Sequence, residues 1–236
     1  MLLLAFDTAT PAVTVALHDG ARVLAEESAV DARRHGELLA VSIQRVLAAA
    51  NAAAGDLTGI AVGVGPGPYT GLRVGLVTAR VLGSALGVPV HGACTLDVIA
   101  RAAASGLAST GVGTVADGAA DGTAGGTACG DFIVATDARR KEVYWARYTA
   151  TAQRVRGPEV SVPGELDACC PVAGEGAMLY PAELGAPIGP RYPAAAWLAD
   201  LIAERILSGA ATLAAEPLYL RRPDARIPGP LKRVTP

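Results

Sequence analysis

Residues 63–75 read GVGPGPYTGLRVG, a glycine- and proline-rich turn between an apolar stretch and an amphipathic one. Turns of this kind at the start of a helix often hold phosphate. A Walker loop would need a lysine just before its Ser or Thr, and no lysine occurs between Gly63 and Thr78. Pro66 and Pro68 also lack the backbone N–H that a phosphate would use. The simpler interpretation is a rigid strand-to-helix corner, with a phosphate cradle as the alternative.

Small residues recur every four positions in the helix expected after this turn. They are Gly71, Gly75, Ala79 and Gly83. A glycine inside a helix costs roughly 1 kcal/mol relative to alanine, so a close approach of another segment should offset that cost. The stripe could pack on the chain's own sheet or form a seam with a helix of a partner chain. The spacing leaves both open.

Apolar stretches along the chain alternate between strand-like and helix-like periods. Strands are expected at 2–6, 13–17, 22–26, 59–64, 88–91, 132–135 and 143–148, and helices at 35–53, 71–86, 95–104 and 194–207. Thr70 is a candidate N-cap for the helix at 71–86, and Gly87 a candidate terminator. The order of elements predicts an α/β protein of two lobes.

A change in composition divides the chain. Residues 105–130 contain almost only Gly, Ala, Ser, Thr and Asp, and such a stretch buries too little apolar surface to offset its ordering entropy. We therefore expect a flexible insertion there. The other parts are an N-terminal lobe over 1–104 completed by the C-terminal helix region 194–210, a smaller second lobe at 131–193 and a tail at 211–236.

Charge and composition argue against several classes of protein. The 236 residues carry a formal net charge of −2, so no basic surface for tight nucleic-acid binding can be inferred. No lysine or arginine precedes the apolar MLLLAF start, which indicates no signal peptide, and no long apolar run indicates a membrane span. The four cysteines match no zinc spacing. We expect reduced thiols and a cytoplasmic protein.

Two turns resemble the phosphate loops of actin-like and sugar-kinase-like ATPases. Asp7 and Thr10 follow the first strand, and Asp137 follows the first strand of the second lobe. The first loop of such ATPases has a glycine where Ala9 stands, because the backbone must approach the phosphate. With Thr70, these residues are weak candidates for nucleotide binding. No histidine pair has ligand spacing, so no metal site and no catalytic residue is predicted.

Several segments in order along the chain resemble the bacterial TsaB (YeaZ) family. They are LLLAFDTAT at the start, RRHGELL at 33–39, the turn at 63–75, DARRKEVYWA at 137–146 and PLYLR at 217–221. His35 and Glu37 fit the family's His-x-Glu pattern, with Gly36 where serine is common. The 105–130 stretch lies outside the match.

The resemblance implies a two-lobed actin-like ATPase (ribonuclease-H-like) fold, with mixed sheets flanked by helices. It also implies a non-catalytic subunit that binds TsaD, works with TsaE and supports threonylcarbamoyl transfer to the adenosine next to the tRNA anticodon. The chain would form a homodimer when alone and meet tRNA only through the complex. It would have no intrinsic cofactor, with ATP or ADP possible at the complex with TsaD, and no membrane contact.

In the family, the first two helices of the N-terminal lobe form the seam with TsaD or with a second copy. We expect that seam to include Leu38, Leu39, Ile43, Val46, Gly71, Gly75, Leu76 and Ala79. The competing hypothesis is an enzyme, an actin-like ATPase or small-molecule kinase that acts on its own. In that case Asp7, Thr10, Thr70 and Asp137 would hold phosphate and metal.

Overall fold

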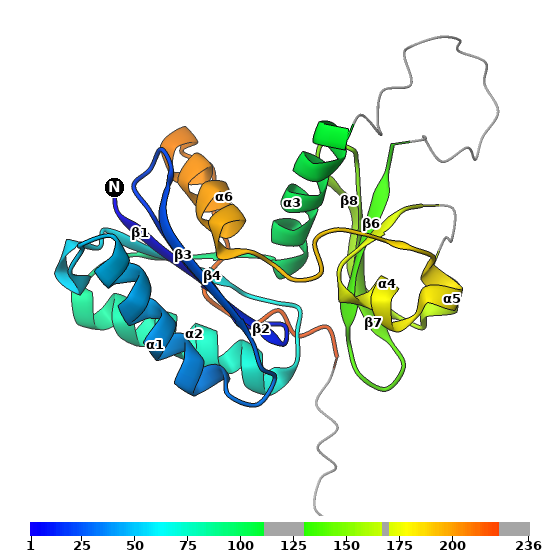
Figure 1. The fold of residues 1–236 in the computed structure, drawn as a ribbon, viewed down its shortest axis with the longest axis horizontal. Helices are drawn as coiled ribbons and strands as arrows, with labels where there is room; N and C mark the ends of the chain where they lie inside the picture. The colour runs from blue at the N-terminus through cyan, green and yellow to red at the C-terminus, as the bar shows by residue number, and fades with distance from the viewer. Residues whose placement is uncertain (111–129, 167–169, 222–236) are drawn as a thin grey trace, which may run out of the picture.

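The computed structural model describes residues 1–110, 130–166 and 170–221, which form two lobes, each built on one five-stranded sheet (Figure 1). The sheet of the first lobe has the order β3-β2-β1-β4-β5. Its strands are β1 (Leu3–Asp7), β2 (Ala12–His18), β3 (Val23–Val30), β4 (Gly59–Gly63) and β5 (Val90–Ala93). Strands β1, β2 and β3 pair antiparallel, whereas β1, β4 and β5 run parallel.

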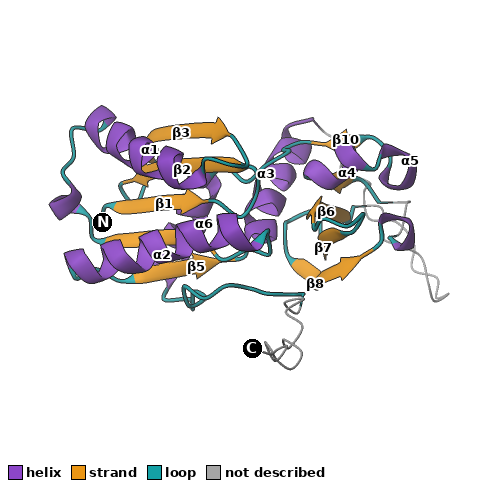
Figure 2. Ribbon diagram, turned by 90° about the horizontal axis from the view of Figure 1, so that it is seen from below, coloured by secondary structure: helices purple, strands orange, loops and turns teal. Residues whose placement is uncertain are grey.

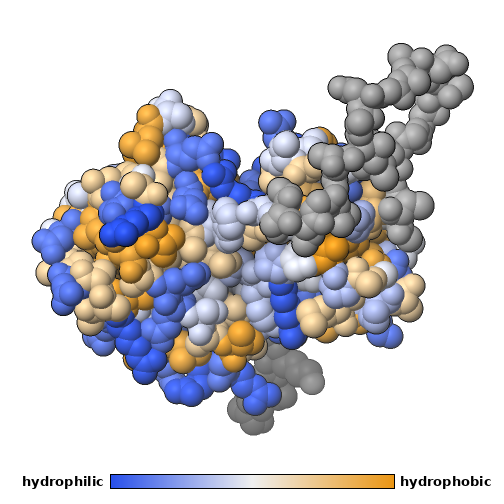
Figure 3. Space-filling model, turned by 45° about the horizontal axis from the view of Figure 1, so that its top comes forward, coloured by the Kyte–Doolittle hydropathy of each residue, from blue (hydrophilic) through white to orange (hydrophobic). Residues whose placement is uncertain are grey.

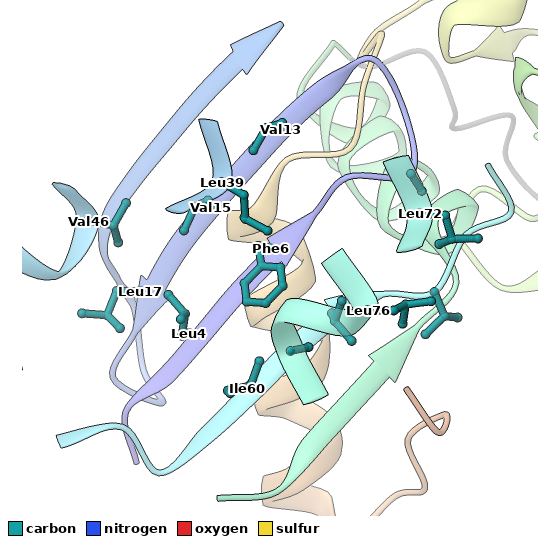
Figure 4. Packing of buried hydrophobic residues seen from close by; sticks show 14 of the residues in the cluster. Leu4, Phe6, Val13, Val15, Leu17, Leu39, Val46, Ile60, Leu72 and Leu76 are labelled. Atoms are coloured by element: carbon teal, nitrogen blue, oxygen red, sulfur yellow. The ribbon is translucent and has the colours of Figure 1, made fainter. Parts of the chain in front are cut away.

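Helices cover both faces of the first sheet. α1 (His35–Ala49) and α2 (Tyr69–Leu86) pack on one face, and α6 (Ala195–Ser208) packs on the other (Figure 1). The buried residues of β1 alternate between these faces, as the two-residue period of a strand requires. Phe6 points toward α1 and α2, where it lies between Leu39 and Leu76 (Figure 4). Leu3 and Ala5 pack under α6.

The second lobe repeats this topology. Its sheet has the order β8-β7-β6-β9-β10, again with two antiparallel pairs followed by two parallel ones. The strands are β6 (Phe132–Asp137), β7 (Val143–Tyr148), β8 (Arg154–Ser161), β9 (Val172–Ala173) and β10 (Pro187–Ile188). Two lobes with the same strand order define the actin-like, ribonuclease-H-like architecture, which confirms the predicted fold class.

Three further helices complete the structure. α3 (Thr95–Thr110) follows β5 and packs on both α6 and β6, so it lies between the lobes (Figure 1). α4 (Glu175–Leu179) and α5 (Pro181–Leu184) follow β9. One-turn 3₁₀ helices occur at Ala54–Asp56 and Pro163–Glu165. Among the described residues, no helix is both long and apolar enough to cross a membrane.

Several predicted boundaries need correction. α1 ends at Ala49 rather than at 53, because Asn51 takes a left-handed conformation with φ of 51°. α2 begins at Tyr69 with Pro68 as its N-cap, so Thr70 lies inside the first turn and caps nothing. α3 extends to Thr110, so the beginning of the predicted insertion is helical. The rest of that insertion, 111–129, lies outside the described residues.

The segment 211–221 joins the two lobes (Figure 2). Leu213 forms an isolated antiparallel bridge with Gly92 at the end of β5. The Leu218 amide donates to the Val64 carbonyl at 2.8 Å, and Arg221 donates to the Ala138 carbonyl of the second lobe at 3.2 Å. This part of the predicted tail is therefore packed, and we call it the strap. Residues 222–236 lie outside the described residues.

Candidate functional site

Asp7, the last residue of β1, is fully buried. Its carboxylate accepts hydrogen bonds from the Ala9 amide and from the Thr95 hydroxyl, both at 2.7 Å. Burial raises the pKa of Asp7 above its ordinary value of 3.8, while those two hydrogen bonds oppose the shift. A side chain at Gly63 would collide with this carboxylate, since a Cβ there would lie 1.9 Å from Oδ2. Asp7 therefore tethers neighbouring segments inside the fold.

Thr8 explains why the start of α2 contains two glycines. Its hydroxyl donates to the Gly71 carbonyl at 2.8 Å and accepts from the Gly75 amide at 3.0 Å. These two backbone groups are four residues apart, so the hydroxyl stands where their helical hydrogen bond would form. A Cβ at Gly71 would lie 2.6 Å from the Thr8 carbonyl oxygen, and a Cβ at Gly75 would lie 2.5 Å from Thr8 Oγ1. Only glycine permits this approach without a shift.

The glycine turn packs on the turn that follows β1. Gly65 has φ of +87°, and a Cβ at Gly67 would lie 2.1 Å from the Ala9 carbonyl oxygen. Thr95 fixes the turn from the other side, since its amide donates to the Gly65 carbonyl at 2.8 Å and its hydroxyl accepts from the Gly65 amide at 3.2 Å. The glycines thus serve close backbone contacts within the chain, which supports the interpretation of this turn as a rigid corner.

The equivalent turn of the second lobe, between β6 and β7, has a strained backbone. Arg139, Arg140 and Lys141 have φ of 64°, 55° and 62°. This left-handed region costs a non-glycine residue about 1–2 kcal/mol. Hydrogen bonds hold the turn closed, because Ala138 and Glu142 bond across it at 3.0 Å and the Arg139 amide donates to Asp137 at 2.7 Å. The Arg139 side chain also pairs with Asp137 at 3.2 Å.

A small pocket of about 270 Å³ lies between these two turns. Its lining includes Thr10, Thr70, His35 and Arg139. The His35 Nε2 donates to the Thr10 carbonyl at 2.8 Å, which fixes the imidazole at the base of α1. Two of the four candidate nucleotide ligands, Thr10 and Thr70, therefore meet at one pocket. Asp7 and Asp137 do not line it.

Sequence reasoning missed the two threonines that organise this region. Thr8 and Thr95 contact residues 67 and 88 positions away along the chain. Thr8 was visible only as a hydroxyl in a turn, and Thr95 only as a residue at the start of a helix. In the described parts of the chain, no group of three or more His, Cys, Asp or Glu side chains could hold a metal ion.

Most of the expected seam residues face the chain's own core. Leu39, Val46, Gly71, Gly75, Leu76 and Ala79 are buried in this structure. Leu38 and Ile43 are partly buried and pack against the same core. Gly71 and Gly75 of the stripe lie against Thr8, which is the packing within the chain that the spacing allowed. Whether these seam residues also take part in contact with a partner chain stays a prediction.

The outer side of these helices carries exposed valines. Val77 and Val81, one turn apart on α2, are 55% and 60% exposed, and Val41 of α1 is also exposed. Val74 of α2 is partly buried on the same stripe. We call these four valines the outer face of α1 and α2. Isolated exposed apolar residues are common on proteins, and Figure 3 shows others on both lobes among hydrophilic side chains.

The repeated sheet topology and the two equivalent turns place the chain in the actin-like class of two-lobed proteins. Residues 22–121 match the family model described as TsaD, tRNA N6-adenosine threonylcarbamoyltransferase. An uncharacterized protein of Mycobacterium tuberculosis is 41% identical over 228 residues, which cover 95% of this chain and 93% of that protein. A Mycobacterium leprae relative is also 41% identical, but the chain spans only 56% of its length.

Named relatives narrow the assignment. The Escherichia coli "tRNA threonylcarbamoyladenosine biosynthesis protein TsaB" is 32% identical over 148 residues, which cover 63% of this chain and 55% of that protein. The solved structure of YeaZ from Pseudomonas aeruginosa matches with a TM-score of 0.71 and 26% identity, covering 93% of this chain and 99% of that one. The chain belongs to the TsaB (YeaZ) family.

Proposed function

We propose that this chain is a non-catalytic subunit that binds TsaD and supports transfer of a threonylcarbamoyl group to the adenosine next to the tRNA anticodon. Membership of the TsaB family and the name of the E. coli relative support a role in threonylcarbamoyladenosine synthesis. TsaE would join the same complex, and tRNA would meet the chain only there. The cytoplasm is where such a complex would work.

One observation supports this proposal most directly: the residues of the turn after β1 are hydrogen-bonded to, or packed against, other parts of the same chain. The Asp7 carboxylate is occupied by Ala9 and Thr95, and the Thr8 hydroxyl by α2. Gly67 packs on the Ala9 carbonyl, at the position where an ATPase of this class needs open backbone. These contacts favour a scaffold over an independent phosphoryl-transfer enzyme.

The outer face of α1 and α2 is the surface that we assign to TsaD, or to a second copy of the chain when TsaD is absent. It presents Val77 and Val81 on α2 and Val41 on α1, and the two helices contact each other along the sheet. The buried core of a protein–protein interface is more apolar than the rest of the protein surface, so exposed valines are suited to such a position. The buried residues of the expected seam would then affect binding of TsaD only indirectly, because their packing on the core fixes the positions of α1 and α2.

Size-exclusion chromatography with light scattering tests the proposal. The chain is measured alone and mixed with TsaD of the same organism. A homodimer alone that gives way to a heterodimer with TsaD would support the scaffold function. A chain whose mass is unchanged by TsaD would contradict it. ATP hydrolysis by the isolated chain, followed as phosphate release, would instead favour the independent ATPase or kinase.

A further inference from the structure

The strap is anchored to the first lobe through its backbone. Gly92 of β5 and Leu213 exchange two hydrogen bonds, at 2.8 and 3.0 Å. The Leu218 amide donates to the Val64 carbonyl at 2.8 Å. The Leu218 side chain packs against the core of the first lobe and also against the apolar cluster that α3 shares with β6 and β7. The strap therefore runs where the two lobes meet (Figure 2).

Two side-chain contacts join the strap to the exposed side of α2. Tyr219 stacks on Tyr69, the first residue of α2, with ring centroids 5.5 Å apart and an interplanar angle of 23°. Glu216 pairs with Arg80 at 3.8 Å. All four side chains are exposed, and exposed ion pairs contribute little to stability. These contacts can therefore break while the backbone hydrogen bonds of the strap persist.

The last residue of the strap contacts the strained turn between β6 and β7. Arg221 donates to the Ala138 carbonyl at 3.2 Å and pairs with Glu142. Ala138 and Glu142 stand on either side of the three left-handed residues, 139–141. Non-glycine residues keep such a backbone only where their surroundings impose it, and Arg221 contacts both flanks of the run. We therefore expect the turn to relax when Arg221 is released.

We propose that the strap is a latch through which α2 of the first lobe controls the conformation of the β6–β7 turn in the second lobe. In the latched state, Tyr219 stacks on Tyr69, and Arg221 holds the turn in its strained form. In the released state, the end of the strap leaves α2, Arg221 leaves Glu142, and the turn relaxes. The strained turn is the two-state element that such a coupling requires. Neither core has to rearrange.

The α2 end of the latch lies beside the exposed valines of the same helix. Val77 stands three positions before Arg80 and eight after Tyr69, so these three side chains share one side of α2. A partner that covers the outer face of α1 and α2 would therefore also reach the latch. The latch itself consists of contacts within the isolated chain, so it does not depend on the proposed function.

Hydrogen exchange of single amides, followed by NMR on the full chain, tests the latch. The reporters are the amides of Ala138 and Glu142, which donate across the turn at 3.0 Å each. Arg221→Met keeps the apolar stem and removes the donors. It should raise both exchange rates about tenfold or more, since hydrogen bonds to charged groups are the stronger ones. Arg22→Met, at an exposed arginine in the β2–β3 turn, is the matched control and should leave both rates unchanged.

The link to α2 is tested from the other end of the strap. Tyr69→Leu removes one ring of the stack, in the first lobe. It should still raise the exchange of the two reporter amides, by about threefold or more, as the loss of one aromatic pair permits. Tyr219→Leu should have the same effect, and the double variant should match the single ones, because all three break one contact. The Gly75 amide, bonded to Thr8 inside the first lobe, should respond less than the reporters.

Three results would overturn the latch. Unchanged reporter exchange in Arg221→Met would show that the strap does not hold the turn. Unchanged reporter exchange in both tyrosine variants, or effects that add in the double variant, would show that the ring stack does not act on the second lobe. An equal rise at the Gly75 amide would mean that the whole chain has lost stability. Circular dichroism shows whether each variant is folded, and the tyrosine variants decide the outcome if Arg221→Met is not.

Discussion

The amide of Gly75 donates a hydrogen bond at 3.0 Å to the hydroxyl of Thr8, a side chain that precedes it by 67 positions. The hydroxyl thereby stands in the hydrogen-bond ladder of α2 and ties the turn after β1 to this helix. The glycine turn that follows β4 lies between the turn after β1 and Thr95 at the start of α3. In the turn after β1, the side chains of Asp7 and Thr8 are thus hydrogen-bonded to other parts of the chain.

Gly75→Ala should destabilise the folded chain. Its Cβ would lie 2.5 Å from Thr8 Oγ1, and overpacking of this kind costs roughly 1–3 kcal/mol. Urea unfolding followed by circular dichroism measures the loss. Gly36→Ala on α1 is the control, because open space surrounds that position and alanine there should be neutral or stabilising by up to about 1 kcal/mol.

The double variant Thr8→Ala/Gly75→Ala shows whether contact with the Thr8 hydroxyl causes the destabilisation by Gly75→Ala. Removing the hydroxyl makes room for the new methyl group, so the cost of Gly75→Ala should shrink in this background. Equal costs in both backgrounds would mean that Thr8 is not what requires glycine at this position.

Thr95→Val should also destabilise the chain. It keeps the shape of the side chain but removes the hydroxyl that donates to Asp7 and accepts from the Gly65 amide. Buried groups left without a partner cost about 1–3 kcal/mol each. Thr78→Val on α2 is the matched control and should change the free energy of unfolding by less than about 0.5 kcal/mol. A loss no larger than that of the control would contradict the bridging role of Thr95.

The periods of the sequence predict the first lobe well, because its central strands β1, β2 and β4 are apolar stretches buried on both faces, and its helices α1 and α2 each bury one stripe. β8 escaped prediction, since this edge strand is polar and contains a Gly-Pro step, which only an edge tolerates. The sequence also did not predict which way the glycine stripe of α2 faces. A helix that packs on its own sheet and one that packs on a partner require the same four-residue spacing, and the deciding atom, Thr8 Oγ1, lies far away in the sequence.

The pH dependence of stability should reveal the burial of Asp7. Burial raises its pKa in the folded state above the unfolded value, so the folded chain binds the proton more tightly. The titration of Asp7 therefore adds to the free energy of unfolding below about pH 4. This added stability is lost as pH rises through the pKa of Asp7 in the folded chain. Asp7→Asn removes this titration. The wild type should lose stability relative to this variant as pH increases, as measured by urea unfolding at a series of pH values. A difference that stays flat, or that changes in the opposite direction, would contradict the raised pKa.

Val77→Asp should weaken the complex with TsaD if the outer face of α1 and α2 is the interface. A charge placed at the centre of an apolar contact must be desolvated without a partner, so we expect the dissociation constant to rise about tenfold or more, equivalent to about 1.4 kcal/mol. Val155→Asp on β8 is the matched control, since Val155 is 54% exposed but lies on the second lobe. Titration calorimetry with TsaD measures both variants, and their thermal melts should stay close to that of the wild type. If Val155→Asp weakens binding and Val77→Asp does not, TsaD binds the second lobe instead.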